Sequence, residues 1–367
     1  MSLYGLFTLA TSYLPSVGGG AALAAKAQLG KARSLYVPDL FAGILSGEPT
    51  RNPHEEEVGR ASEEWTKKLV KMDKRTAKIL TKANFAYLVS LAAPLADEEA
   101  FRMGVDWCIW AFVFDDQFDE GPMRDKGIEA AREIIDMLAT QDDTCALVDP
   151  VVHPLQYMFQ SVWQRFKARN PSPGLERRWK YTHKRCLFAI LKQVDATQRK
   201  ITLDVDLDDY METRRHSIGA YSLFAVVEWA HAIKAPEEAM NHPSVQTCER
   251  VAADLTWLVN DVLSYKKDLA FGVEHNLTRL LMRQGLTEQG AMDKLGQLME
   301  SNQRDWEDAI AELPHWEDEE TNKEVRRYLD ACAAVGRANL HWSFKSGRYL
   351  NAEQGRKVRE TRIMDLP

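Results

Sequence analysis

The sequence lacks the features of several protein classes. Its five cysteines are scattered over 367 residues and never occur as Cys-x-x-Cys. This pattern indicates neither a disulfide framework nor a zinc site, so the expected location is the reducing cytoplasm. No stretch approaches the roughly 18 consecutive apolar residues of a membrane-spanning helix. Acidic residues outnumber lysine and arginine, and the resulting net charge of -7 argues against a nucleic-acid partner.

The chain also has little that would divide it into several domains. Beyond residue 60, no stretch rich in Pro, Gly or Ser indicates a linker. The first 38 residues differ from the rest, because they contain Lys26, Lys31 and Arg33 but no acidic residue. A targeting peptide is one interpretation of this composition. No basic region precedes the apolar part, so we favour an N-terminal arm over residues 1–36 and a single domain over residues 37–367.

Alternating patterns of the β type are almost absent. From Asn52 onward, apolar residues recur at intervals of three and four, which predicts helices and hardly any sheet. The content of 45% hydrophobic and 28% charged residues suits a protein with a large buried core. The expected fold is an all-α single-domain bundle. The expected helices span residues 54–72, 75–92, 97–118, 126–140, 153–170, 175–200, 206–216, 221–233, 244–269, 287–313 and 319–345.

One apolar helix ends abruptly in acidic residues, within the stretch FVFDDQFDE at residues 112–120. Asp115 and Asp119 share one helical face, roughly 5–6 Å apart at Cβ, and Asp116 flanks them. Carboxylates at this spacing suit Mg2+, which keeps several waters and shares its remaining positions with substrate phosphates. For this stretch alone, a solvated helix end is the alternative interpretation.

A second polar stripe lies in NDVLSYKKD at residues 260–268. Asn260, Ser264 and Asp268 recur at every fourth residue, and each step advances only about 40° around a helix. Their oxygens can therefore converge on one ion, although a polar helix face is the alternative. The two motifs together are far more specific than either one. Basic residues accompany them at Arg214, Lys267 and Arg348.

These motifs resemble those of the class I terpene cyclases, and more narrowly those of the fungal sesquiterpene synthases. The resemblance rests on DDQFDEG at residues 115–121, NDVLSYKKD at 260–268, RRHSIG at 214–219 and the Arg348-Tyr349 pair. Further segments are similar to the presilphiperfolanol synthase type, and the likeness spans nearly the whole chain after the first thirty-odd residues. These segments are VPDLF at 37–41, DWCIWAFVF at 106–114, GVEHNL at 272–277 and HWSFKSGRYL at 341–350.

The resemblance implies a class I terpene synthase bundle in which the two polar motifs face each other across the mouth of a central cavity. It implies ionisation of farnesyl diphosphate, release of diphosphate and cyclisation of the carbocation to a hydrocarbon or alcohol. Three Mg2+ ions are expected, with Mn2+ as a substitute, in a monomer or homodimer. Asp268 stands where Glu is frequent in the wider family. The expected metal ligands are Asp115, Asp116, Asp119, Asn260, Ser264 and Asp268.

Basic residues are expected to bind the diphosphate. Arg214 lies before Asn260 at the spacing where the family places its diphosphate-sensing arginine, and the adjacent Arg215 is the substitute if this register is wrong. For each basic residue taken alone, a surface salt bridge is the alternative. The other expected diphosphate donors are Lys267, Arg348, which can donate bidentately, and Tyr349.

Aromatic residues are expected to stabilise the carbocation through their ring faces. Phe112 and Trp342 are the first candidates for the cavity wall, followed by Trp257 and Phe85. Plain core packing is the alternative for each of them. Gly219 is expected to break a helix into two halves, where freed backbone carbonyls face the cation.

Two other functions compete with cyclisation. A prenyl chain-elongating synthase also ionises an allylic diphosphate with magnesium, but it carries two Asp-rich motifs, whereas the second motif here is Asn/Ser/Asp. A non-catalytic helical protein that binds isoprenoids would not need both polar motifs together with the basic residues.

Overall fold

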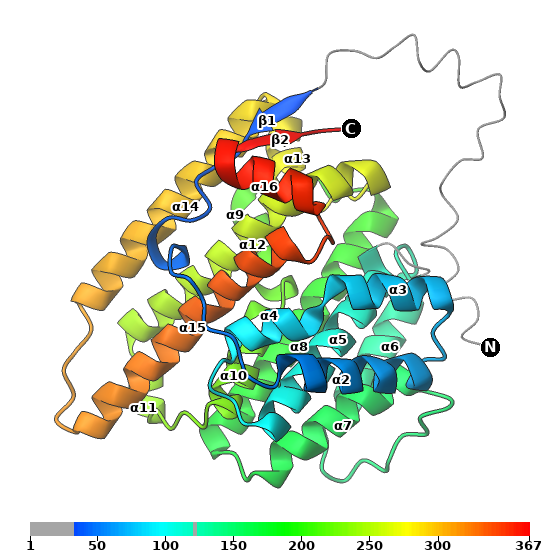
Figure 1. Cartoon of the computed structure of the whole chain (residues 1–367), viewed down its shortest axis with the longest axis vertical. Coiled ribbons are helices and arrows are strands. Elements are labelled where there is room, and N and C mark those ends of the chain that lie inside the picture. Colours follow the sequence, from blue (N-terminus) through cyan, green and yellow to red (C-terminus); the bar gives the residue numbers. More distant parts are fainter. Residues whose placement is uncertain (1–32, 120–122) are drawn as a thin grey trace.

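A computed structural model describes residues 33–119 and 123–367, so most of the expected N-terminal arm lies outside the described residues. Helices make up nearly all of the regular structure, and the all-α prediction is confirmed (Figure 1). Two short strands in the described part, β1 (Ser34–Tyr36) and β2 (Ile363–Asp365), pair antiparallel, with Leu35 opposite Met364. The last residues of the expected arm are therefore joined to the C-terminal end of the chain.

All but one of the expected helices agree with a single observed helix to within a few residues. The periodicity of apolar residues thus located these segments, because each helix buries one face or more against its neighbours. The helices are α2 (Glu55–Leu69), α5 (Glu98–Asp119), α6 (Gly127–Ala139), α7 (Pro154–Ala168), α8 (Pro173–Arg199), α9 (Leu207–Ser217), α10 (Ala220–Ala230), α12 (Pro243–Phe271), α14 (Glu288–Ala311) and α15 (Glu319–Lys345).

The helix expected over residues 75–92 is wrong as a single element. The structure divides it into α3 (Lys74–Ala83) and α4 (Phe85–Ala92). Asn84 between them has a left-handed backbone, with φ 49° and ψ 60°, a conformation that Asn tolerates better than most residues. Its side chain accepts a hydrogen bond from the Tyr87 N–H and so caps α4.

Four short helices within the described residues were not expected from the sequence. Three of them have at most seven residues, too few for apolar periodicity to identify. The fourth, near the C-terminal end, has Val358 as its one large apolar residue. The four are the 3-10 helix η3 (Gly43–Leu45) and the α-helices α11 (Glu237–Met240), α13 (Leu277–Arg283) and α16 (Ala352–Thr361).

The central helix of the bundle is α12. It begins at Pro243 and ends at Phe271, and the next residue, Gly272, closes the helix with a positive φ of 66°, a conformation suited to glycine. Every residue from Val251 to Tyr265 is buried, because α14 and α15 pack along this helix. A helix that is buried on all sides must satisfy its polar side chains inside the protein. The predicted stripe of Asn260, Ser264 and Asp268 therefore faces the interior.

The bundle surrounds a cavity with walls from α5, α8, α10, α12 and α15. The α9–α10 pair contributes to its rim, where Gly219 separates the two helices with φ 76°. No helix among residues 33–119 and 123–367 has both the length and the apolar character needed to cross a lipid bilayer.

Candidate active site

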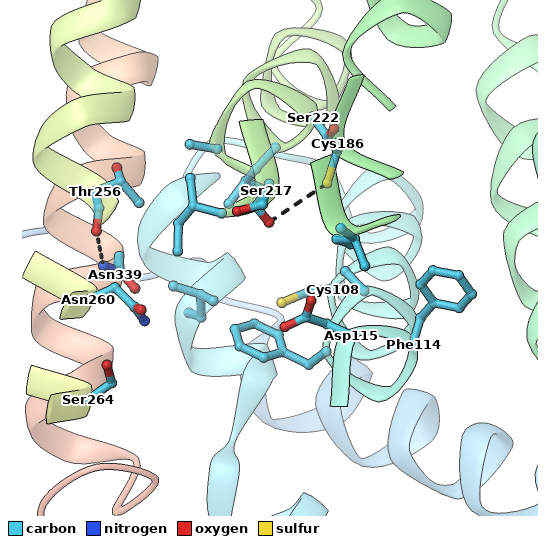
Figure 2. A pocket seen from close by; sticks show the side chains of 18 of the residues that line it. Cys108, Phe114, Asp115, Cys186, Ser217, Ser222, Thr256, Asn260, Ser264 and Asn339 are labelled. Atoms are coloured by element: carbon cyan, nitrogen blue, oxygen red, sulfur yellow. Dashed lines mark hydrogen bonds between the residues drawn. The ribbon is translucent and has the colours of Figure 1, made fainter. Parts of the chain in front are cut away.

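The cavity brings together most of the residues singled out in the sequence. The polar motifs of α5 and α12 face each other across it, with Asp115 on one side and Asn260 and Ser264 on the other (Figure 2). The predicted residues on its wall are Phe112, Asp115, Arg214, Gly219, Asn260, Ser264, Lys267, Asp268, Arg348 and Tyr349.

The C-terminal member of the α12 stripe, Asp268, is a buried carboxylate that accepts two hydrogen bonds. The Ser264 Oγ donates to Asp268 Oδ2 at 2.6 Å, and Asn276 Nδ2 donates to the same oxygen at 3.0 Å. Burial raises the pKa of Asp268, although the nearby Lys267 charge and both hydrogen bonds oppose that rise. A cation beside this carboxylate would favour its ionised form further.

Asn260 is the N-terminal member of the stripe and forms hydrogen bonds with two other predicted site residues. Its Oδ1 accepts a hydrogen bond from Arg214 Nη2 at 2.6 Å, and its Nδ2 donates to the Tyr349 hydroxyl at 2.9 Å. This one amide therefore connects α9, α12 and the segment that follows α15.

The three aspartates of α5 differ in their surroundings. Asp115 lines the cavity. Asp116 does not, and instead pairs with Arg348, whose Nη2 donates to Asp116 Oδ1 at 2.7 Å. Burial raises the pKa of Asp116, but the charge of Arg348, its hydrogen bond and the charge of Lys267 together lower that pKa below its ordinary value. The side chain of Asp119 lies outside the described residues.

The oxygen-rich walls fit a hard divalent cation. Asn260, Ser264 and Asp268 offer an amide, a hydroxyl and a carboxylate oxygen, and Asp115 offers carboxylate oxygens from the opposite wall. Among the residues that the structure describes, no three His, Cys, Asp or Glu side chains form a metal-binding group by themselves. A metal here would consequently depend on amide and hydroxyl oxygens and on waters or phosphates, as Mg2+ sites do.

Arg214 is held at the rim by a buried partner that the sequence analysis did not assign. Its Nε donates to Asp261 Oδ1 at 2.9 Å, and Asp261 is fully buried. The other carboxylate oxygen of Asp261 accepts from the Tyr210 hydroxyl at 2.7 Å and from the Leu277 N–H at 2.9 Å. Asp261 lies inside the quoted motif NDVLSYKKD, directly after Asn260, but nothing in a single sequence assigns it to Arg214.

Arg215 points away from the cavity. Its Nε and Nη2 donate to the two oxygens of the buried Asp254, at 2.7 and 3.1 Å, and its Nη1 donates to Glu212 at 2.9 Å. The two adjacent arginines therefore lie on different faces of α9. Of the two, Arg214 is the one on the cavity wall.

The break at Gly219 also lies on the cavity wall. Its left-handed backbone follows Ile218, and no side chain caps the first turn of α10. Ser217 ends α9 immediately before the break, and its hydroxyl accepts a hydrogen bond from Gln193 Nε2 at 2.7 Å. The expected division into two half-helices is thus present in the structure.

The expected aromatic residues form two layers. Phe112 lies on the cavity wall, and the ring of Phe85 stacks against it with 4.3 Å between centroids. Trp342 lies in the second layer, 5.3 Å from Phe112, and its indole N–H donates to the Ala83 carbonyl at 2.7 Å. Phe85 and Trp342 therefore support the wall rather than form it.

Trp257 is not part of the cavity wall, contrary to expectation. A step of three residues turns a helix by about 300°, so Trp257 points about 60° away from Asn260. It is fully buried on another face of α12, where its indole N–H donates to Asp254 Oδ1 at 2.9 Å. The ring packs edge-on against Tyr210.

A buried pair on the cavity wall was not predicted. The Trp107 indole N–H donates to His183 Nε2 at 2.8 Å, and His183 Nδ1 lies 2.8 Å from the Trp179 carbonyl. Both nitrogens of the imidazole are thus engaged when the ring is neutral with its proton on Nδ1. Burial lowers the pKa of His183 to about 4, despite the hydrogen bond to Trp179. Trp107 belongs to the quoted DWCIWAFVF, whereas no sequence signal marks His183.

The comparisons with known proteins agree with this geometry. Residues 106–305 match the family model described as terpene synthase family 2, C-terminal metal binding. The chain belongs to the terpene synthase family. The (+)-eremophilene synthase of Gibberella fujikuroi is 40% identical over 92% of this chain and 94% of its own length. The silphinene synthase of Penicillium patulum is 36% identical, covering 91% of each chain.

A solved structure confirms the fold. The α-eudesmol synthase structure superposes on this terpene synthase with a TM-score of 0.72, over 82% of this chain and 98% of that one. At 21% identity, this likeness concerns the fold alone. The matched family region begins just before the acidic motif of α5 and extends beyond α12, so it contains both polar walls of the cavity.

Proposed function

We propose that this terpene synthase is a Mg2+-dependent sesquiterpene cyclase. It ionises farnesyl diphosphate, releases diphosphate and cyclises the carbocation to a polycyclic hydrocarbon or alcohol. The observation that carries this proposal is the placement of Asp115 opposite Asn260, Ser264 and Asp268 at one cavity. The names of the two relatives, both sesquiterpene synthases, support a substrate of fifteen carbons.

The charged residues of the rim bind the diphosphate. Arg214, Lys267 and Arg348 all lie on the cavity wall, where their cations attract the diphosphate and offset the charge that develops on it as the carbon-oxygen bond breaks. A bound divalent metal adds charge neutralisation at the same leaving group. Asp115 and Asp268 are the carboxylates that would hold it, together with Asn260 and Ser264.

The rest of the cavity protects the cation. Phe112 presents a ring to the interior, and Trp107, Trp110 and Phe114 contribute further aromatic surface. Ring faces stabilise positive charge but offer no nucleophile, and a closed apolar wall keeps bulk water away. The neutral His183 has both nitrogens engaged, so it does not act as a base towards the cation.

Chain elongation is the competing reaction. The second polar wall contains one carboxylate, an amide and a hydroxyl rather than a second aspartate-rich motif, and this favours cyclisation. The product skeleton is a separate question, because the names of the two relatives denote different products. The presilphiperfolanol-type skeleton implied by the sequence resemblance is one candidate.

The test is a product profile from the purified protein. C10, C15 and C20 prenyl diphosphates are supplied with Mg2+, each alone and each mixed with a C5 prenyl diphosphate. Diphosphate release is measured, and volatile products are identified by gas chromatography with mass spectrometry. We expect the C15 substrate to give cyclic products and the highest turnover. Elongated diphosphates from mixed C5 and C10 or C15 substrates, or binding without diphosphate release, would contradict the proposal.

A further inference from the structure

The Ser222 hydroxyl lies on the wall of the cavity and makes no hydrogen bond to an oxygen or nitrogen atom among the described residues. Ser222 is three residues beyond the Gly219 break, in the first turn of α10, and only 1% of its surface is exposed. A buried hydroxyl that makes no hydrogen bond costs about 1–3 kcal/mol. Such groups are usually satisfied by an ordered water.

Two further polar groups surround this position. The Cys186 thiol of α8 lies beside Ser222 (Figure 2), where it is at most a weak hydrogen-bond partner of the hydroxyl, and it donates a weak hydrogen bond to the Ser217 carbonyl oxygen at 3.9 Å. Burial, reinforced by the charge of Asp115, raises the pKa of Cys186 to about 12, so the thiol is neutral and a poor nucleophile. The niche thus offers weakly polar, uncharged groups.

Gly219 borders this niche. A Cβ built at Gly219 would be in ordinary van der Waals contact with Cys186 Sγ, at 4.0 Å. The positive φ of 76° independently favours glycine at this position. The carbonyl of Ser217, the thiol of Cys186 and the hydroxyl of Ser222 therefore border one small site beside the helix break.

We propose that Ser222 and the Ser217 carbonyl hold a single water, and that this water quenches a carbocation late in the reaction. The inference rests on the proposed cyclase function and adds that the product is an alcohol. The water donates its two hydrogens to the Ser222 Oγ and the Ser217 carbonyl oxygen, which leaves its lone pairs directed at the cavity. Its oxygen forms the new carbon-oxygen bond, and the proton released passes to the diphosphate product.

Other polar groups on the wall suit this role less well. The Thr256 hydroxyl donates to the Ala252 carbonyl at 2.7 Å and is satisfied. The buried Trp110 indole N–H also has no partner among the described residues, but it is a donor and would occupy a lone pair of a bound water. His275 Nε2 is likewise without a partner there, but its ring packs at a tilt against Tyr210, close to the charge of Arg214, on the proposed diphosphate side.

The experiment is turnover of the C15 diphosphate in water enriched in oxygen-18. Products are separated by gas chromatography, the labelled alcohol is measured by mass spectrometry as a fraction of all products, and diphosphate release is recorded in parallel. We expect the wild-type alcohol to carry one labelled oxygen. Ser222→Ala should lower the alcohol fraction at least about fivefold, the effect of losing one hydrogen bond of about 1 kcal/mol.

Two further variants make this test decisive. Ser222→Cys keeps the size of the side chain but replaces the hydroxyl with a weak hydrogen-bonding group, and it should lower the alcohol fraction as Ser222→Ala does. Ser343→Ala is the matched control, because Ser343 is also fully buried with a hydroxyl lacking a partner in the described chain, yet it does not line the cavity. It should leave the alcohol fraction unchanged.

The outcomes separate this inference from the proposed function. A wild-type protein that releases no diphosphate refutes the cyclase proposal. A wild-type protein that releases diphosphate but forms only unlabelled hydrocarbons refutes the water site alone. An undiminished alcohol fraction in the Ser222 variants, or an equal loss in Ser343→Ala, also refutes it.

Discussion

Arg348 Nη2 donates to Asp116 Oδ1 at 2.7 Å, which joins the segment after α15 to the acidic end of α5. Asp115, one residue earlier, lines the cavity instead. The two adjacent carboxylates thus have different surroundings: Asp115 faces the cavity, and Asp116 holds Arg348, the arginine that we propose binds diphosphate.

This difference leads to the first prediction. Asp115→Asn should lower the rate of diphosphate release at least about tenfold more than Asp116→Asn, which corresponds to about 1.4 kcal/mol of activation free energy. The measurement is kcat for the C15 substrate at saturating Mg2+. Asp116→Asn should mainly raise KM, because Arg348 loses the charge that positions it. A larger kcat effect for Asp116→Asn would assign direct metal binding to Asp116 instead.

The second prediction concerns Asn260. Asn260→Ala removes one oxygen from the polar stripe of α12 and a hydrogen-bond partner of Arg214. We expect at least about a tenfold loss of turnover, or about 1.4 kcal/mol, and a higher Mg2+ concentration for half-maximal rate. Chelation of divalent cations should abolish wild-type activity. Asn339→Ala is the control, because this amide donates to the Thr256 carbonyl at 3.1 Å and is not part of the stripe; its Mg2+ dependence should match that of the wild type.

The third prediction separates the two adjacent arginines. Arg214→Lys keeps the charge but loses the planar fork that we propose binds diphosphate in two places. It should lower turnover at least about tenfold, or about 1.4 kcal/mol, and it should also lower stability, because it weakens the hydrogen bond to the buried Asp261. Arg215→Lys should destabilise the fold by about 1.5–3 kcal/mol without a comparable loss of turnover, because it weakens hydrogen bonds to the buried Asp254 but leaves the cavity wall unchanged. Steady-state kinetics and chemical denaturation together distinguish the two effects, and the reverse pattern would identify Arg215 as the diphosphate sensor.

The fourth prediction concerns the aromatic layers. Phe112→Leu should shift the product mixture towards less cyclised hydrocarbons or alcohols, because it removes a ring face from the cavity wall. Trp342→Phe should change the product mixture less and should lower stability by about 0.5–1.5 kcal/mol, since it deletes the hydrogen bond to the Ala83 carbonyl. Product ratios from gas chromatography and melting curves provide the measurements. Unchanged product ratios for Phe112→Leu would assign that residue to ordinary core packing.

The fifth prediction is a loss of stability in acid that depends on His183. Burial lowers its pKa in the folded protein to about 4, from an ordinary value of 6.5. Below pH 6.5 the unfolded chain binds a proton that the folded protein does not, so this residue makes stability fall as the pH drops from about 6.5 to about 4. The free energy of unfolding should fall by about 3 kcal/mol over this range, because each pH unit contributes about 1.4 kcal/mol.

Urea denaturation at several pH values checks this effect. His183→Gln has no titrating ring, so its stability should depend less steeply on pH over that range than the stability of the wild type. His315→Gln is the control, because the His315 side chain is 70% exposed. Equal pH slopes for wild type and His183→Gln would contradict the prediction.

The sequence by itself determined the features that depend on local spacing. Apolar residues at intervals of three and four located the long helices, and steps of four placed Asn260, Ser264 and Asp268 on one stripe. These relationships follow from helix geometry, which needs no knowledge of neighbouring elements. Helical geometry together with the family motifs therefore sufficed to predict an all-α fold and the residue types of both polar walls.

The tertiary structure decided which side chains meet across the bundle. The pairing of Arg214 with Asp261, of Arg348 with Asp116 and of Trp107 with His183 joins residues on different elements. Trp107 with His183 and Arg214 with Asp261 meet because packing places at least one buried polar group in each pair, and a buried polar group needs a partner whatever its distance along the chain. Arg348 and Asp116 meet at the rim, where Asp116 is partly exposed. Packing likewise decided which face of α12 meets the cavity, since this helix is buried on all sides and local periodicity cannot distinguish its faces. Trp257 lies on another face, where its ring packs against Tyr210 of α9.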